Sequence, residues 1–257
     1  GIDHGIKFKR IDIEGEPTID ADADLVVDVS RGTTLEQNGA RISTVEHVLS
    51  AVVGYQIDNI IIELDGPEIP IMDGSAIMFY DTLVASEVID TDKDREYLVI
   101  NEIITYKDRE TGAELIALPS DFFEITTLVD FNSDYLGQQY ADFGFDDSFE
   151  KDIAPARTFA FLHELELLFD QGLIKGGDLD NAVIIANEKT STEKLASLSS
   201  KLGKGVLKVD EAGVLNTSKL RYSNEPARHK LLDVIGDLSL VGHPIKGRIV
   251  ATKPGHK

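Results

Sequence analysis

The stretch RHKLLDVIGDL, residues 228–238, has the pattern of an amphipathic helix with one unusual polar side. His229 and Asp233 are four positions apart, which places them about 40° from each other around a helix. Asp237 continues the same side one turn further on. The apolar residues recur at helical spacing on a different face, and they are Leu231, Leu232, Ile235 and Leu238. The column of one imidazole and two carboxylates therefore needs an explanation beyond core packing.

The spacing of His229 and Asp233 suits chelation of one metal ion, because side chains four positions apart on a helix can reach the same point. The pair also has a simpler interpretation. A histidine and an aspartate in this relation more often form a plain hydrogen bond or a surface ion pair. A third ligand from elsewhere in the chain would favour the metal.

The segment RISTVEHVLSAV, residues 41–52, offers such a ligand. His47 follows Glu46 on a predicted helix whose other side is aliphatic. Two histidines and one aspartate leave an open position on a tetrahedral ion, which is the arrangement of a catalytic zinc site. An adjacent carboxylate can then act as general base toward water. The segment lacks the H-E-x-x-H signature of the zinc peptidases.

Both residues of this segment also have structural interpretations. Ser43 and Glu46 fit the S-x-x-E capping box, in which the glutamate side chain bonds the amide of the capping residue. His47 fits a core imidazole that is bonded to a backbone carbonyl. The sequence leaves these alternatives open.

Composition narrows the classes of partner. The chain has 257 residues, 46 acidic and 25 basic, and a formal net charge of −21. This charge argues against a nucleic-acid partner and against an anionic membrane surface. It still allows a local basic pocket for a small anion, because exposed charges more than about 10 Å apart are screened at 0.1 M salt. The chain has no cysteine and no stretch typical of a signal peptide or membrane span, so we expect a cytoplasmic protein without stable membrane insertion.

Both halves of the chain mix short strands with helices, which predicts an α+β fold. We expect a first domain over residues 1–92 and a second over 93–257, because the charged run DTDKDRE (90–96) is typical of a linker. Helices are predicted over residues 43–55 and 156–173. The polar segment 189–225 is predicted to be an insertion of a helix and a loop.

Three long strings occur in the order of a known family. ISTVEHVLSAVVGYQIDNIIIELDGPEIPIMDGSA (42–76), ARTFAFLHELE (156–166) and RHKLLDVIGDL closely resemble the UDP-3-O-acyl-N-acetylglucosamine deacetylases, the LpxC family of zinc amidases in Gram-negative lipid A synthesis. The resemblance implies two α+β domains, each with a sheet layered on helices, and an active site between the packed helix layers. It also implies hydrolysis of the acetamide of UDP-3-O-(3-hydroxyacyl)-N-acetylglucosamine, a small-molecule substrate, with release of acetate.

The resemblance further assigns roles to individual residues. His47, His229 and Asp233 match the zinc ligands, and Glu46 matches the general base. Thr158 matches a hydroxyl that stabilises the oxyanion. His256 matches a cationic histidine that protonates the leaving amine, and Asp237 matches the carboxylate that holds this histidine.

Substrate contacts are expected from two groups of residues. Lys230 and Lys253 match positions that hold the anionic part of the substrate, although solvated surface lysines are the alternative. The acyl chain is expected in a groove formed by an insertion over about residues 157–187. Its predicted lining is Phe159, Phe161, Leu173, Ala182 and Ile184, each of which plain core packing explains equally well.

The resemblance has departures near both ends of the sequence. The family's opening strands with a Gly-Leu-His motif are missing, and the chain stops one residue after His256, so we expect a truncated chain. The long segment 189–225 suggests a version fused to a hydroxyacyl-carrier-protein dehydratase. Two alternative functions stay open, namely an inert module that binds acyl-sugar nucleotides and a zinc amidase of other specificity.

Overall fold

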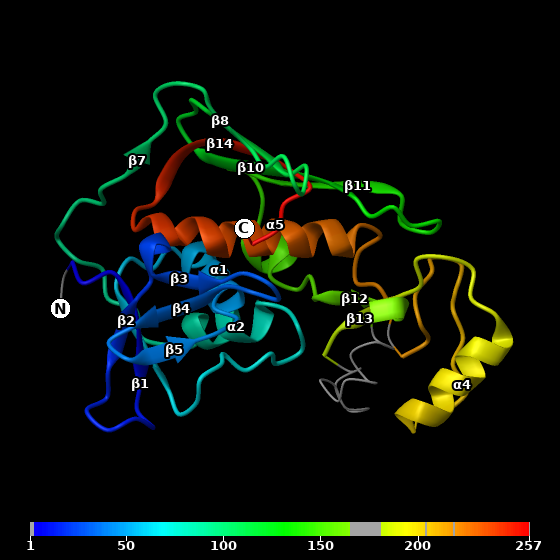
Figure 1. Cartoon of the computed structure of the whole chain (residues 1–257). Coiled ribbons are helices and arrows are strands. Elements are labelled where there is room, and N and C mark those ends of the chain that lie inside the picture. Colours follow the sequence, from blue (N-terminus) through cyan, green and yellow to red (C-terminus); the bar gives the residue numbers. More distant parts are fainter. Residues whose placement is uncertain (1–2, 165–180, 204, 218, 257) are drawn as a thin grey trace.

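The first half of the protein contains two small sheets and two helices (Figure 1). The computed structural model describes residues 3–164, 181–203, 205–217 and 219–256. In chain order, the first-half elements are β1 (Ile6–Arg10), β2 (Thr18–Asp20), η1 (Ala23–Leu25), β3 (Val26–Asp28), β4 (Thr34–Gln37), β5 (Ala40–Ile42), α1 (Glu46–Gly54), β6 (Ile60–Leu64) and α2 (Ile77–Val84).

The two small sheets share one hydrophobic core with α1. One sheet has the strand order β2-β1-β6, in which β1 pairs parallel with β6, and the other is the antiparallel sheet β3-β4-β5. Alternation along the strands places Phe8, Ile19, Leu35 and Ile42 in this core, each with no exposed surface. Leu49 of α1 completes it from the helix side.

The second half is built on a larger sheet. Its elements are β7 (Leu98–Val99), β8 (Ile104–Lys107), β9 (Glu114–Leu118), β10 (Phe123–Asp130), β11 (Gln138–Phe143), η2 (Phe149–Ile153), β12 (Phe159–Phe161), β13 (Val183–Ile185), α4 (Thr192–Leu202), α5 (Glu225–Leu238), η4 (Ser239–Val241) and β14 (Ile245–Thr252). The sheet has the order β11-β10-β14-β9-β8, and β7 pairs with the start of β14. Ile125 and Ile249 face Leu231 and Leu232 of α5, so this sheet is layered on α5.

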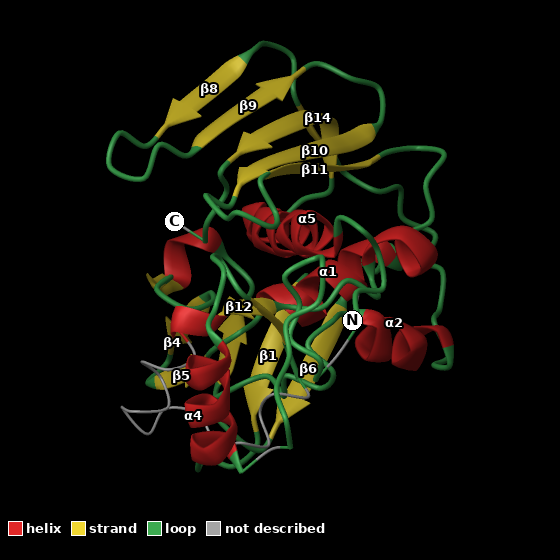
Figure 2. Cartoon of the chain, turned by 90° about the vertical axis from the view of Figure 1, so that its right-hand side faces the viewer, coloured by secondary structure: helices red, strands yellow, loops and turns green. Residues whose placement is uncertain are grey.

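The helices α1 and α5 lie against each other between the two halves (Figures 1 and 2). Their approach is so close at Gly236 that a Cβ atom there would stand 2.1 Å from the carbonyl oxygen of Glu46. Only glycine fits this position without displacement of one helix. The predicted α+β fold, with sheets layered on helices, is confirmed. The domain boundary after residue 92 stays a prediction.

The predicted helix over residues 156–173 is wrong at its start. Residues 159–161 form the strand β12, which pairs parallel with β13 in the register Phe159↔Val183 and Phe161↔Ile185. The Phe-Ala-Phe run suits a strand that packs on both faces, with the two phenylalanines on one face and the alanine on the other, better than the helical period that we assigned. Helical turns begin only at residue 162, and residues 165–180 lie outside the described part of the chain.

The helix and loop predicted within residues 189–225 are confirmed by α4, and their being an insertion stays a prediction. Ser191 accepts a hydrogen bond from the amide of Lys194 at its start, and Gly203 ends the helix with a left-handed backbone at φ 63°. Leu195 and Leu198 of α4 pack on one face of the β12-β13 pair. Among the helices of the described ranges, none has both the length and the apolar character needed to cross a membrane.

Candidate active site

His47, His229 and Asp233, here called the cation trio, meet where α1 contacts α5. The Nε2 atom of His229 is 3.3 Å from Asp233 Oδ1, and the Nε2 atom of His47 is 3.7 Å from the same oxygen. The three residues are 2–4% exposed. Their ligand atoms all lie within 4.8 Å of one another, so the three groups are close enough to bind one ion.

The hydrogen bonds around the cation trio leave atoms of His229 and Asp233 free to bind an ion. His229 Nδ1 is 3.0 Å from the carbonyl oxygen of Ala156, and because a carbonyl only accepts, this nitrogen carries the proton. The Nε2 lone pair of His229 is therefore free. Asp233 Oδ1 is buried and has no hydrogen-bond partner among the described residues, nor has Nδ1 of His47. A buried carboxylate oxygen without a donor is costly, and two imidazoles with one carboxylate are a donor set that suits zinc.

The protonation states of the cation trio also suit cation binding. Burial lowers the pKa of His47 to about 3, with the neighbouring His229 as a further cause. Burial likewise lowers the pKa of His229, so both imidazoles are neutral at pH 7. Burial alone would raise the pKa of Asp233, but His229 and the Lys230 ammonium outweigh it and lower that pKa. Neutral imidazoles and an ionised carboxylate are the forms that coordinate a metal.

Glu46 does not form the capping box that the sequence allowed. The helix α1 begins at Glu46 itself, its N-cap residue Val45 has no side-chain cap, and the amide of Ser43 donates to the carbonyl of Pro67 instead. The Glu46 carboxylate turns into the site, where Oε2 accepts a hydrogen bond of 3.0 Å from the amide of Thr33. The structural interpretation of Glu46 is therefore wrong.

Burial raises the pKa of Glu46 to about 7, and the negative charge of Asp233 contributes. His256 and the amide of Thr33 act in the opposite direction. A carboxylate with a pKa near neutrality is matched to proton transfer at physiological pH.

Glu46, Asp237 and His256, here called the acid–base trio, form a second cluster beside the first. His256 Nδ1 is 2.9 Å from Asp237 Oδ2, and His256 Nε2 is 4.0 Å from Glu46 Oε1. Burial alone would lower the pKa of His256, but the hydrogen bond to Asp237 and the surrounding carboxylates raise it to about 9. The imidazole is therefore a cation at pH 7, with Nε2 directed at Glu46 and at Asp233 Oδ2, 3.9 Å away.

The predicted substrate lysines differ in their position. The Lys230 ammonium is 3.1 Å from Asp233 Oδ2 and lies 5.9 Å from the ring centre of Phe159, so it stands beside the cation trio. Burial would lower its pKa, but Asp233 raises it above the usual value. Lys253 is exposed on the loop after β14, three residues before His256. Thr158 lies two residues beyond the carbonyl that binds His229, and its own amide donates to Gly74.

The predicted acyl-groove residues are not one surface, which corrects the sequence interpretation. Phe159 and Phe161 share one face of the β12-β13 pair with Val183 and Ile185. The opposite face packs under α4 and carries the two other described members of the set, Ala182 and Ile184. Leu173 lies outside the described residues. Only the first face looks toward the cation trio, because the ring of Phe159 is 6.4 Å from that of His229.

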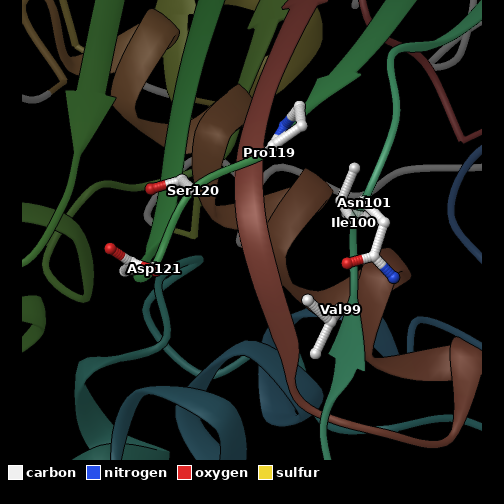
Figure 3. Close-up of a pocket in the computed structure, with 6 residues that line it drawn as sticks. All are labelled: Val99, Ile100, Asn101, Pro119, Ser120 and Asp121. Atoms are coloured by element: carbon white, nitrogen blue, oxygen red, sulfur yellow. The ribbon is translucent and has the colours of Figure 1, made fainter.

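Two of the hollows on the described surface differ in their distance from the trios. One, of about 160 Å³, touches Asp237 and His256 and continues between α5 and the strands β8, β9 and β14. The other, of about 350 Å³, lies away from both trios, between residues 99–101 and the turn 119–121 (Figure 3). The larger hollow contains none of the predicted site residues, so its size does not make it the site of the chemistry.

Two supporting contacts were not predicted. The amide and side chain of Arg157 both donate to the fully buried Glu225 at the start of α5, with Nε 2.9 Å from Oε1. This pair holds the segment whose Ala156 carbonyl orients His229. Thr33 contacts both carboxylates of the acid–base trio. The arginine lies within the string ARTF and the threonine in Gly-Thr-Thr, but neither string indicates a partner that is more than 60 positions away.

Comparison of the sequence with known proteins places the chain in a family. The family described as LpxC, UDP-3-O-acyl N-acetylglycosamine deacetylase, matches residues 1–199 and 196–257. The chain is 44% identical over 253 residues to the bifunctional enzyme LpxC/FabZ of Bacteroides thetaiotaomicron, covering 98% of this chain but 55% of that protein. It is 39% identical over 254 residues to the UDP-3-O-acyl-N-acetylglucosamine deacetylase of Myxococcus xanthus, covering 98% of this chain and 73% of the relative. The enzyme of that name from Syntrophotalea carbinolica is 40% identical over 255 residues, which cover 99% of this chain and 74% of the relative.

Proposed function

The chain belongs to the UDP-3-O-acyl N-acetylglycosamine deacetylase family, and from this premise we propose that it hydrolyses the acetamide of UDP-3-O-(3-hydroxyacyl)-N-acetylglucosamine. The proposed reaction is zinc-dependent, releases acetate and leaves the free amine for lipid A biosynthesis in the cytoplasm. The observation that carries the proposal is the convergence of His47, His229 and Asp233 on one point, with the Glu46 carboxylate beside it.

The proposed zinc ligands are the members of the cation trio. The buried Asp233 oxygen without a partner and the free Nε2 lone pair of His229 support a cation at this point. When bound, zinc supplies a Lewis acid that lowers the pKa of water to about 7 and polarises the amide carbonyl.

Glu46 is the proposed general base. Its carboxylate accepts a proton from the attacking water while the oxygen of that water bonds to the acetamide carbon. The amide of Thr33 holds one carboxylate oxygen, which leaves Oε1 on the side of His256. With its pKa raised to about 7, this carboxylate is suited to taking up and releasing a proton near neutral pH.

His256 is the proposed general acid. Its Nε2 proton passes to the nitrogen of the sugar as the bond between that nitrogen and the acetyl carbon breaks. Asp237 orients the ring through Nδ1 and helps to keep it cationic. Water supplies one of the two oxygens of acetate and the proton that Glu46 takes, and the amide carbonyl supplies the other oxygen. Release of that proton to solvent and uptake of one proton by His256 return both groups to their starting forms.

The remaining residues have proposed roles in binding. The hydroxyl of Thr158 would donate to the oxygen that gains negative charge at the acetamide carbonyl. The ammonium groups of Lys230 and Lys253 would hold the anionic part of the substrate and so give an acidic protein a local basic pocket. Phe159 and Phe161 offer an apolar surface that leads away from His229 and suits an acyl chain.

The proposal is tested with the zinc-loaded chain and three measurements, namely acetate release, amine formation and zinc content. We expect hydrolysis of UDP-3-O-(3-hydroxymyristoyl)-N-acetylglucosamine and no hydrolysis of acetylated peptides. Glu46→Gln is the matched control, because it keeps the shape of the side chain but cannot accept the proton. Hydrolysis of the peptides alone would favour an amidase of other specificity. Binding of the sugar nucleotide without turnover would favour a binding module.

The full-length protein is the subject of a second proposal. The chain spans about 55% of the length of the bifunctional LpxC/FabZ relatives that it matches. We propose that the natural polypeptide also carries a hydroxyacyl-carrier-protein dehydratase. The mass of the native protein, with a dehydratase assay on hydroxyacyl thioesters, tests this. A native protein without dehydratase activity would contradict it.

A further inference from the structure

Thr33 is buried at the point where the loop after β3 enters β4, and it contacts both carboxylates of the acid–base trio, Glu46 and Asp237. It is 1% exposed. Its hydroxyl donates to Asp237 Oδ1 at 2.6 Å, across 204 positions of the sequence, and its amide donates to Glu46 Oε2 at 3.0 Å. One residue therefore holds the proposed base through its backbone and the carboxylate behind the proposed acid through its side chain.

This contact lies one hydrogen bond away from His256. His256 lies on the loop after β14, and within the described part of the chain its ring makes one hydrogen bond, from Nδ1 to Asp237 Oδ2. The two oxygens of Asp237 are therefore divided between Thr33 and His256. A carboxylate bonded on one oxygen alone can rotate about its terminal torsion, which is broad in energy. With both oxygens engaged, the plane of Asp237 and the direction of the His256 ring are set together.

The loop is shaped to bring Thr33 to this position. Gly32 precedes it with φ +151°, and a Cβ atom on Gly32 would stand 2.7 Å from Glu46 Oε1. The carbonyl of Thr33 in turn accepts from the amide of Val45, just before α1. The loop thus lies directly against the Glu46 carboxylate.

We propose that Thr33 is a positioning residue for the deacetylation, whose hydroxyl fixes Asp237 and thereby directs His256 at the leaving nitrogen. This inference rests on the proposed function. It assigns the role to the hydroxyl alone, because the amide contact to Glu46 survives any substitution that keeps the backbone in place.

The kinetics of side-chain variants test the proposed role of the Thr33 hydroxyl. Thr33→Val keeps the shape and the amide but removes the donor, and Thr33→Ser keeps the donor. We expect Thr33→Val to lower kcat by about 10- to 100-fold with little change in KM or zinc content, and Thr33→Ser to restore kcat. Thr34→Val is the matched control, since the Thr34 hydroxyl bonds Ser43 rather than the trio. An equal loss of kcat in Thr33→Ser and Thr33→Val would overturn the proposal.

A double-mutant cycle separates positioning from a general packing effect. If Thr33 acts through Asp237, Thr33→Val should have no further effect on kcat in a chain that already carries Asp237→Ala. A loss of the same size in both backgrounds would show that the threonine acts by another route and would contradict the inference.

A measurement without turnover keeps this test independent of the proposed function. In protein labelled with ¹⁵N-histidine, the Nδ1–H signal of His256 is assigned by its disappearance in His256→Gln. We expect a slowly exchanging signal in the wild type and Thr33→Ser, and faster exchange with water in Thr33→Val. An unchanged signal in Thr33→Val would contradict the proposed effect of the Thr33 hydroxyl on His256. Failure of the wild type to release acetate, with the signal responding as expected, would contradict the proposed function alone.

Discussion

The cation trio and the acid–base trio lie side by side but are held in different ways. All members of the cation trio come from the two contacting helices, and each is almost fully buried. The acid–base trio takes one member from each helix and the third, His256, from a loop, and it relies on Thr33 from another loop. Helix packing brings the first trio together, with the Ala156 carbonyl orienting His229, whereas the second trio depends on hydrogen bonds that involve two loops. The two trios should therefore respond differently to substitution.

The largest effect is expected from Asp233→Ala, a substitution in the cation trio. This change removes the one carboxylate of the cation trio, so we expect zinc content to fall from about one per chain to none and turnover to fall below detection. Metal analysis of the dialysed variant measures the first effect. Asp142→Ala, at an exposed position on β11, serves as control. Zinc retained at full occupancy would exclude Asp233 as a ligand.

Glu46→Gln should affect only the acid–base trio. Glutamine still accepts the hydrogen bond from Thr33 but cannot take a proton, so we expect kcat to fall by about 10²- to 10⁴-fold with zinc content unchanged. Loss of zinc together with turnover would mean that the two trios do not act separately.

The pH dependence of kcat/KM should report the acid–base trio. Glu46 must be deprotonated to act as base, so activity should rise with pH through a pKa near 7. His256 must be protonated to act as acid, so activity should fall again through a pKa near 9. We expect His256→Gln to lower the rate by about 100-fold and to remove the alkaline fall. An alkaline fall that persists in this variant would assign it to another group.

Gly236→Ala should disturb the helix contact beneath both trios. The added Cβ would stand 2.1 Å from the Glu46 carbonyl oxygen, so one helix must shift. Overpacking of this kind costs about 1–3 kcal/mol of unfolding free energy, which denaturant titration measures. Gly66→Ala is the control, because a Cβ there meets nothing within 4 Å. Equal stability of the two variants would show that the helices can separate without cost.

Local patterns predicted some features and misled at others. The helical period around Leu231 correctly predicted α5, and the i, i+4 spacing of His229 and Asp233 correctly placed both on one side of it. The capping-box pattern at Ser43 and the helical period from residue 156 were wrong. In both places a partner distant in sequence outweighs the local preference, since Thr33 engages Glu46 and β13 pairs with β12.

The sequence alone determined the two helices that carry the site and the chemical character of their side chains, because spacing along a helix depends only on near neighbours. It indicated a histidine and carboxylates on one face of α5, and a second histidine beside a glutamate on α1. Only the tertiary structure decided that these faces meet, that the Ala156 carbonyl orients His229, and that Thr33 engages Asp237. These contacts join residues 73 to 204 positions apart. Their geometry follows from the packing of α1 on α5 and of the loops around them, which no periodicity encodes.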